Sequence, residues 1–149
     1  MKWLVLGLGN PLAGADAFGP AVIARLGSAV RLPDGVELVD AHTDLLAYLH
    51  RFADHDGVVL VDAALSADGH GVTLVDEETF VSWDDRSLGA HEWSPVAVVK
   101  LFRCLHPHAR TCVFLVACVV PESDFAAPPR SEAVEAGVHA VYRLIDRTP

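Results

Sequence analysis

Apolar residues along this chain form two kinds of pattern that alternate from one end to the other. Short continuous apolar runs, rich in Val and Leu, are typical of strands buried on both faces. Stretches in which apolar residues recur three and four positions apart are typical of helices that pack on one side. The predicted strands are 2–8, 36–40, 57–63, 71–77 and 112–120, and the predicted helices are 17–29, 44–52, 94–104 and 131–146.

The order of these elements predicts the fold class. Strands that alternate with helices form a mostly parallel sheet covered on both faces, so we expect a three-layer α/β/α fold with about five strands. The run at 71–77 follows the preceding strand through a short polar loop, and we expect it to lie antiparallel at an edge. Residues 78–92 show no period and are predicted to be a loop. We expect residues 1–149 to form one domain.

Polar residues follow three of the predicted strands. Asn10, Asp40 and Asp62 come at or just after the ends of the runs at 2–8, 36–40 and 57–63. The functional crevice of a parallel α/β sheet lies beyond the carboxyl ends of its strands. We therefore expect the functional site at this edge, among acidic side chains.

A glycine-rich segment, GLGNPLAGADAFG at 7–19, joins the first strand to the first helix. A turn of this kind often holds a phosphate at the helix N-terminus. The dinucleotide-binding fingerprint requires a third glycine where this chain has Leu12, and the carboxylate of Asp16 would repel a phosphate. Two interpretations of Asp16 remain, a helix N-cap and a group that faces a cation.

The balance of charges removes some classes of partner. The formal net charge is −9, which opposes binding to a phosphate backbone, so we expect no nucleic-acid partner. The longest apolar run, 112–120, is too short to cross a bilayer, and we expect a cytoplasmic protein with no membrane partner. The three cysteines lack the spacing of a zinc site, and Cys118 is expected to be a small core residue.

Three residues have the chemistry of a metal site. Asp16, Asp62 and His91, the last in the segment GAHEWSP, could meet above the sheet edge. Two carboxylates and an imidazole suit a divalent transition-metal ion. Taken singly, each has a plainer interpretation, because such acids often cap helices or turns and a lone loop histidine is usually solvated.

Four motifs in this order are similar to those of one known family. They are LGLGNPLAGADAFG at 6–19, VDA at 61–63, AHEWSP at 90–95 and VVPES at 119–123. With them, the whole chain resembles the hydrogenase maturation endopeptidases, which trim a C-terminal extension from the large subunit of nickel–iron hydrogenases. The resemblance implies a phosphorylase/hydrolase-like fold with a twisted sheet.

The resemblance also implies a site and a partner. Asp16, Asp62 and His91 occupy the positions of the family's metal-binding and catalytic residues, and the metal is a divalent ion, nickel supplied by the substrate. The partner is the large-subunit precursor, and we expect this protein to act as a monomer. Ala15 stands where members commonly have a second acid.

The segment DAHT at 40–43 is a second departure from the family pattern. It replaces a frequent Asp-x-Gly-Thr, with His42 at the glycine position. Asp40, His42 and Thr43 are the predicted substrate-binding residues, and His42 is expected to affect which large subunit is accepted.

Two other functions stay open at this point. The start GLGNP also resembles peptidyl-tRNA hydrolases, but no histidine precedes His42 to serve as their catalytic base. A fold of this kind could also sense the metal or act as a chaperone for the large subunit without cutting it. No Ser–His–Asp or Cys–His arrangement identifies a nucleophile.

Overall fold

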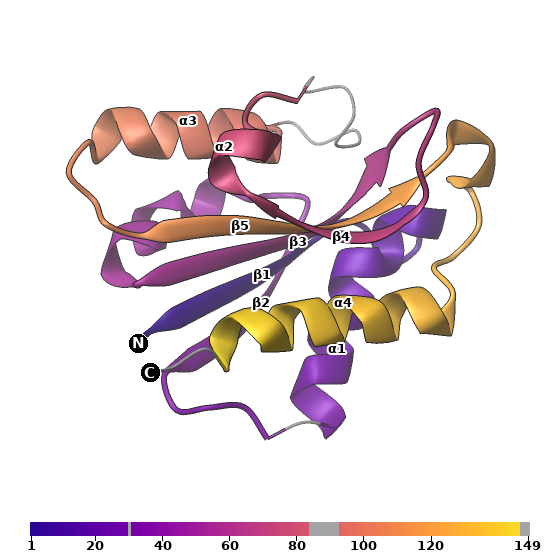
Figure 1. Cartoon of the computed structure of the whole chain (residues 1–149), viewed down its shortest axis with the longest axis horizontal. Helices are drawn as coiled ribbons and strands as arrows, with labels where there is room; N and C mark the ends of the chain where they lie inside the picture. The colour runs from indigo at the N-terminus through magenta and orange to yellow at the C-terminus, as the bar shows by residue number, and fades with distance from the viewer. Residues whose placement is uncertain (30, 84–92, 147–149) are drawn as a thin grey trace.

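Five strands form one sheet in the computed structural model, which describes residues 1–29, 31–83 and 93–146. The order of the strands across the sheet is β2-β1-β3-β5-β4 (Figure 1). The strands are β1 (Trp3–Leu8), β2 (Val36–His42), β3 (Gly57–Leu65), β4 (Gly71–Asp76) and β5 (Cys112–Val120). The three pairings from β2 to β5 are parallel and β4 runs antiparallel to β5, so the predicted antiparallel edge strand is confirmed.

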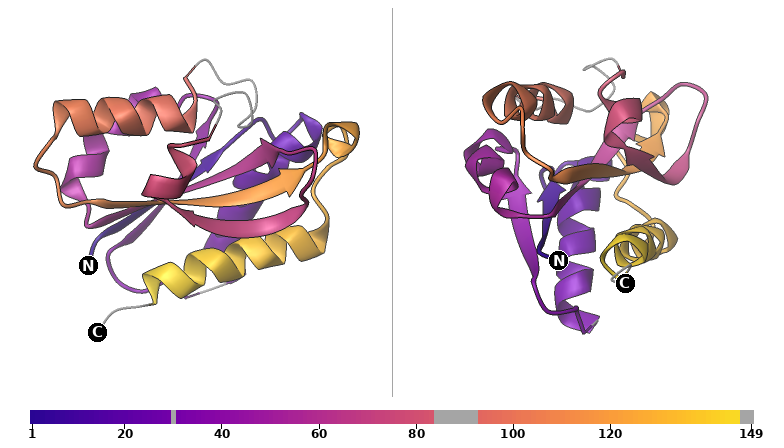
Figure 2. Two further views of the ribbon diagram at one scale, coloured as in Figure 1. Left: turned by 45° about the horizontal axis from the view of Figure 1, so that its top comes forward. Right: turned by 60° about the vertical axis from the view of Figure 1, so that its left-hand side comes forward.

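Helices cover both faces of the sheet (Figure 2). The helical elements are η1 (Gly14–Ala17), α1 (Phe18–Ala29), η2 (Leu46–Asp54), α2 (Glu77–Phe80), α3 (Pro95–Leu105), η4 (Glu122–Asp124) and α4 (Ser131–Ile145). One apolar core lies between the sheet and α1 with α4, and a second lies between the sheet and η2, α2 and α3. The three-layer α/β/α prediction is therefore confirmed.

Alternation along the strands builds the two cores. In β1, Trp3 and Val5 face α1 and α4, whereas Leu4 and Leu6 face the opposite layer. Because neighbouring side chains of a strand point to opposite faces, a continuous apolar run supplies both cores at once. Cys118 is buried in the α1–α4 core as predicted, and burial raises the pKa of its thiol.

The predicted helix at 44–52 forms as the 3₁₀ helix η2 over Leu46–Asp54. Its apolar side chains Leu46, Leu49 and Phe52 recur every third residue, and all three pack in the same core. A 3₁₀ helix has three residues per turn, so this spacing places them in one row.

The predicted loop at 78–92 is wrong in its first residues, because Glu77–Phe80 form the short helix α2. The carboxylate of Asp76 accepts a hydrogen bond of 2.9 Å from the N–H of Thr79 and caps this helix. Phe80 is fully buried in the core beneath it. Residues 84–92 lie outside the described part of the chain.

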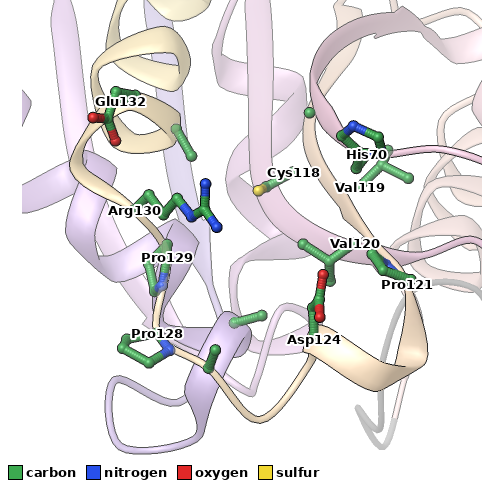
Figure 3. Close-up of a pocket in the computed structure, with 14 residues that line it drawn as sticks. His70, Cys118, Val119, Val120, Pro121, Asp124, Pro128, Pro129, Arg130 and Glu132 are labelled. Atoms are coloured by element: carbon green, nitrogen blue, oxygen red, sulfur yellow. The ribbon is translucent and has the colours of Figure 1, made fainter.

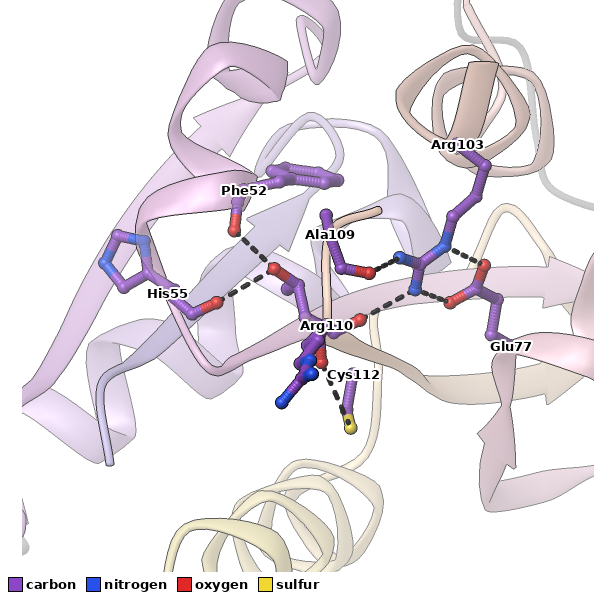
Figure 4. A network of polar contacts seen from close by, with 8 residues as sticks. Phe52, His55, Glu77, Arg103, Ala109, Arg110 and Cys112 are labelled. Carbon is purple, nitrogen blue, oxygen red and sulfur yellow. Dashed lines mark hydrogen bonds and ion pairs between the residues drawn. The ribbon is translucent and has the colours of Figure 1, made fainter. Parts of the chain in front are cut away.

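An arginine network joins α3 to α2 and to the segment before β5 (Figure 4). The guanidinium of Arg103 donates to both carboxylate oxygens of Glu77, at 2.7 and 2.5 Å. It also donates to the carbonyl oxygens of Ala109 and Thr111, at 3.2 and 2.7 Å. The hydrogen bonds that Arg103 donates to the Glu77 carboxylate raise the pKa of Arg103. These contacts therefore fix α3 to α2 and to the segment that leads into β5.

None of the helices among the described residues has the length and apolar character needed to cross a bilayer.

Candidate functional site

Asp62 lies where β3 extends past the end of its neighbour β1. The last residue of β3 paired with β1 is Val61, which lies opposite Gly7, whereas pairing with β5 continues through Asp62 to Leu65. The side chain of Asp62 is completely buried, and its Oδ1 accepts a hydrogen bond of 2.9 Å from the N–H of Ala63. A buried carboxylate requires compensation for its lost hydration, and this peptide N–H supplies part of it.

The chain that leaves β1 folds back over the sheet edge. The N–H of Gly9 donates to the carbonyl oxygen of His42 at 2.7 Å. The φ angle of Gly9 is +124°. A Cβ at this position would overlap the carbonyl oxygen of Asp16 and lie 2.9 Å from its Oδ1. Only glycine therefore allows the turn to approach Asp16 so closely.

Asp16 lies in the short helix η1, which contacts β3. Its Oδ2 accepts a hydrogen bond of 2.7 Å from the N–H of Asn10, six residues earlier. An N-cap carboxylate instead accepts from an N–H two or three residues later. Because the donor precedes Asp16 in the sequence, this bond closes the turn between β1 and η1. It holds the half-buried Asp16 in the element that contacts β3.

Close packing of α1 depends on two glycines that face each other. A Cβ on Gly7 would lie 2.7 Å from the carbonyl oxygen of Gly19, and one on Gly19 would lie 2.6 Å from that of Val61. Gly19, the second residue of α1, thus allows the helix to approach the strand closely. Leu12, at the position of the third glycine of the dinucleotide-binding fingerprint, is 92% exposed and has no such role.

The predicted substrate-binding residues lie together at the end of β2. The N–H of His42 donates to Oδ1 of Asp40 at 3.2 Å, and the imidazole Nδ1 lies 3.7 Å from the same oxygen. His42 and Thr43 are exposed and Asp40 is half-buried. His42 has a φ of +53°, in the left-handed region that favours glycine. His42 therefore keeps a backbone conformation that suits glycine, the residue that is frequent at this position of the Asp-x-Gly-Thr motif.

The third predicted ligand, His91, lies outside the described residues. Within the described ranges, which omit 84–92, no three His, Cys, Asp or Glu side chains are grouped as a metal site. The geometry therefore concerns the two acids. One is buried in β3 and the other is held in a turn against that strand. Oxygen donors of this kind suit a divalent cation.

Comparisons with known proteins point in one direction. No family model matches the chain. A stretch of 81 residues is 37% identical to the hydrogenase 2 maturation protease of Escherichia coli, covering 52% of this chain and 49% of that protein. A stretch of 62 residues is 40% identical to a putative hydrogenase maturation protease of Methanocaldococcus jannaschii, covering 40% of each. The matches thus span half or less of these relatives.

The fold matches over a longer range. The structure of the hydrogenase maturating endopeptidase HybD from E. coli superposes with a TM-score of 0.77 over 98% of this chain and 93% of that one, at 23% identity. At this identity the likeness shows the fold alone. This chain is therefore similar to hydrogenase maturation proteases over about half of its sequence, and it shares its fold with a hydrogenase maturating endopeptidase.

Proposed function

We propose that this protein is an endopeptidase that removes the C-terminal extension of the large-subunit precursor of a nickel–iron hydrogenase, after nickel insertion. The observation that carries the proposal is that η1, which holds Asp16, contacts β3, the strand in which Asp62 is buried. This arrangement lies in a fold shared with a hydrogenase maturating endopeptidase.

The two carboxylates and His91 are the proposed ligands of the nickel that the precursor carries. Carboxylate oxygens and an imidazole nitrogen form a donor set that a divalent transition ion accepts. Asp62 is held rigidly, because its strand is paired on one side by β5 and its Oδ1 is fixed by the N–H of Ala63. Asp16 is fixed by the N–H of Asn10.

These residues would place the precursor so that its scissile segment lies at the sheet edge. Bound nickel can polarise a carbonyl group or activate water. The role of this chain's residues is to orient the segment by holding the metal at one point. Asp40, His42 and Thr43, at the end of β2 and just after it, are proposed to contact the approaching backbone.

We further propose a cytoplasmic monomer, with no nucleic-acid or membrane partner. The net charge of −9 supports the first of these exclusions, because Lys and Arg supply most of the affinity for phosphate backbones.

The test is mass spectrometry of the large subunit after co-expression. We expect its C-terminus to be shortened by the wild-type protein and by Asp34→Asn, and to stay intact with Asp62→Asn. Asp34 is an exposed acid in the turn before β2, at the opposite end of the strands, so it controls for the loss of one charge. A full-length large subunit in the presence of wild-type protein would contradict protease activity. Stable capture of that subunit would then favour a metal-sensing or chaperone module.

A further inference from the structure

A cavity of about 650 Å³ opens beside the turn that carries Asp16 (Figure 3). Its walls come from the end of β5, the start of β4, the segment 121–130 and the first turn of α4. They include Ala15, Val119, Val120, Pro128, Arg130 and Ala133. The cavity is therefore largely apolar, and one wall is the residue that precedes Asp16.

The cavity and the Asp16 turn are fixed to each other. The N–H of Ala15 donates to the carbonyl oxygen of Phe125 at 2.9 Å. A Cβ on Gly14 would lie 2.7 Å from the carbonyl oxygen of Ala126, so the turn and the 121–130 segment are in backbone contact. A group bound in the cavity would thus be held at a constant position relative to Asp16.

A second hollow of about 490 Å³ continues along the same helix and strand. It is lined by Val72 and Leu74 of β4 and by Ala136, His139, Ala140 and Arg143 of α4. The first cavity includes Gly71, the residue before Val72. The two hollows therefore follow one another along β4 and α4, and together we call them the β4–α4 groove.

The groove borders an unpaired strand edge. β4 is the last strand of the sheet and pairs with β5 on one side only. Half of its peptide groups therefore point outward and can pair with an added strand. The stretch from Gly71 to Val75 contains no charged residue and no proline, the usual obstacles to such pairing. The opposite edge strand, β2, carries Glu37 and Asp40.

Arg130 offers one cation in the groove that a carboxylate of a ligand could meet. The guanidinium of Arg130 points from the start of α4 into the first cavity (Figure 3). Within the part of the chain that the structure describes, neither Arg130 nor Arg143 forms an ion pair. Glu135 in the second hollow is neutralised by Arg25 at 2.6 Å. Asp124 and Glu132 also line the first cavity, so only a carboxylate placed at the guanidinium itself would be attracted.

The dimensions fit a short extended peptide. Arg143 of α4 comes thirteen positions after Arg130, its N-cap, which corresponds to about 20 Å at 1.5 Å per residue. A strand of six residues, the length of β4, spans about 20 Å at 3.3 Å per residue.

We propose that the β4–α4 groove binds an extended segment of the precursor next to the bond to be cut. The segment adds as a strand to β4, places an apolar side chain in the first cavity and sets a carboxylate against Arg130. This inference rests on the proposed function for the identity of the ligand. The groove itself is defined by the residues above.

The test measures binding of a synthetic peptide that copies the precursor's C-terminal extension and the residues around the cleavage point. Two variants alter the first cavity: Ala133→Leu fills it and Arg130→Glu reverses its cation. Arg110→Glu and Ala47→Leu make the same changes at exposed positions outside the groove. We expect the first pair to raise Kd at least about tenfold, which corresponds to about 1.4 kcal/mol, and the second pair to leave it unchanged. Arg130→Lys should retain part of the affinity, because it keeps the charge.

Strand addition has its own measurement. Hydrogen exchange of the outward N–H groups of β4 should slow when the peptide binds, and exchange in β2 should not change. Absence of peptide binding at about 1 mM, equal affinity in all variants, or unprotected β4 amides would each overturn the proposal. If wild-type protein cleaves the precursor while the groove variants bind and cleave equally well, only this inference fails. If wild-type protein does not cleave but the groove variants weaken peptide binding, the proposed function fails and the groove stands.

Discussion

At the scale of single residues, the position of Asp16 depends on Gly9. The turn at Gly9 has a φ of +124°, and the space of its missing side chain is taken by the main chain of Asp16. The hydrogen bond from Asn10 to Asp16 then fixes the carboxylate. The site is therefore formed by backbone geometry before any ligand arrives.

Gly9→Ala should destabilise the fold more than Gly71→Ala. Both glycines have a φ that L-residues rarely adopt, +124° and +111°, and this strain costs roughly 1–3 kcal/mol. A Cβ at Gly71 meets nothing within 4 Å, whereas one at Gly9 overlaps Asp16. Urea unfolding of both variants measures the difference. Equal losses would show that the turn relaxes without cost.

His42→Gly should stabilise the protein by up to about 1 kcal/mol. A left-handed backbone costs a residue with a side chain roughly 1–2 kcal/mol, and glycine avoids this cost. Part of the gain is offset because glycine loses more conformational entropy on folding. The carbonyl that accepts from Gly9 is retained in the variant. His42→Ala keeps the strained φ and should give no such gain in thermal unfolding. A stabilising alanine and a neutral glycine would instead indicate that the imidazole itself is unfavourable.

Sequence patterns indicated where the two acids lie along the elements. Asp62 follows the continuous apolar part of β3, and Asp16 comes just before α1. The same patterns could not locate Arg130 in a cavity. Its neighbours come from β4, β5 and η1, so its surroundings are set by tertiary packing and not by any local period.

At the scale of secondary-structure elements, periodicity predicted every strand but not every helix type. Strands with apolar side chains on both faces give a strong signal that needs no knowledge of neighbours. α2 has only four residues and is made by one cap and one buried Phe80, too short for a period to appear. The nine residues of η2 largely coincide with a predicted helix, but only the recurrence of apolar side chains at every third position indicates the 3₁₀ type.

Arg103→Lys should destabilise the protein by about 2 kcal/mol, because a lysine cannot make the forked hydrogen bonds to Glu77 while also reaching two carbonyl groups. Arg110→Lys, an exposed change before β5, is the matched control and should be neutral. Denaturant unfolding gives both values. A neutral Arg103→Lys would show that charge alone holds α3 to α2.

The link between β2 and η2 should depend on pH. Hydrogen bonding from Arg51 lowers the pKa of Glu37, and its charge and that of His55, 3.6 Å away, add to this effect. A carboxyl group whose pKa falls on folding contributes stability above its unfolded pKa of about 4.3. That stability is lost as the pH falls through the lower, folded pKa.

Glu37→Gln should therefore be less stable than wild type at neutral pH, by less than about 1 kcal/mol because Glu37 is exposed to solvent. The difference should shrink as the pH falls below about 4. Glu122→Gln, at an exposed position of η4, should show no such dependence in parallel melts. A difference that persists at low pH would mean that Glu37 acts by packing.

At the scale of the whole molecule, the two acids and the β4–α4 groove lie at different edges of one sheet. Its carboxyl edge carries the acids, and its β4 edge with α4 forms the groove. The turn at Ala15 belongs to both, since it precedes Asp16 and lines the first cavity. A precursor held along β4 would thus reach the acids from a fixed direction, which makes recognition of the segment and of its metal parts of one event.

If Asp16, Asp62 and His91 bind the nickel carried by the precursor, cleavage should require a nickel-loaded large subunit. Three protein ligands leave positions open on the ion, which the precursor's own metal-binding groups can fill. Nickel added to this protein alone should therefore not replace nickel in the precursor. The measurement follows the C-terminal mass of nickel-free and nickel-loaded precursor, incubated with purified protein under reducing conditions. Asp34→Asn should behave as wild type, and Asp62→Asn should leave both precursors intact. Equal cleavage of the two precursors by wild-type protein would refute the role of nickel in recognition, because the acids would then act without the substrate's metal.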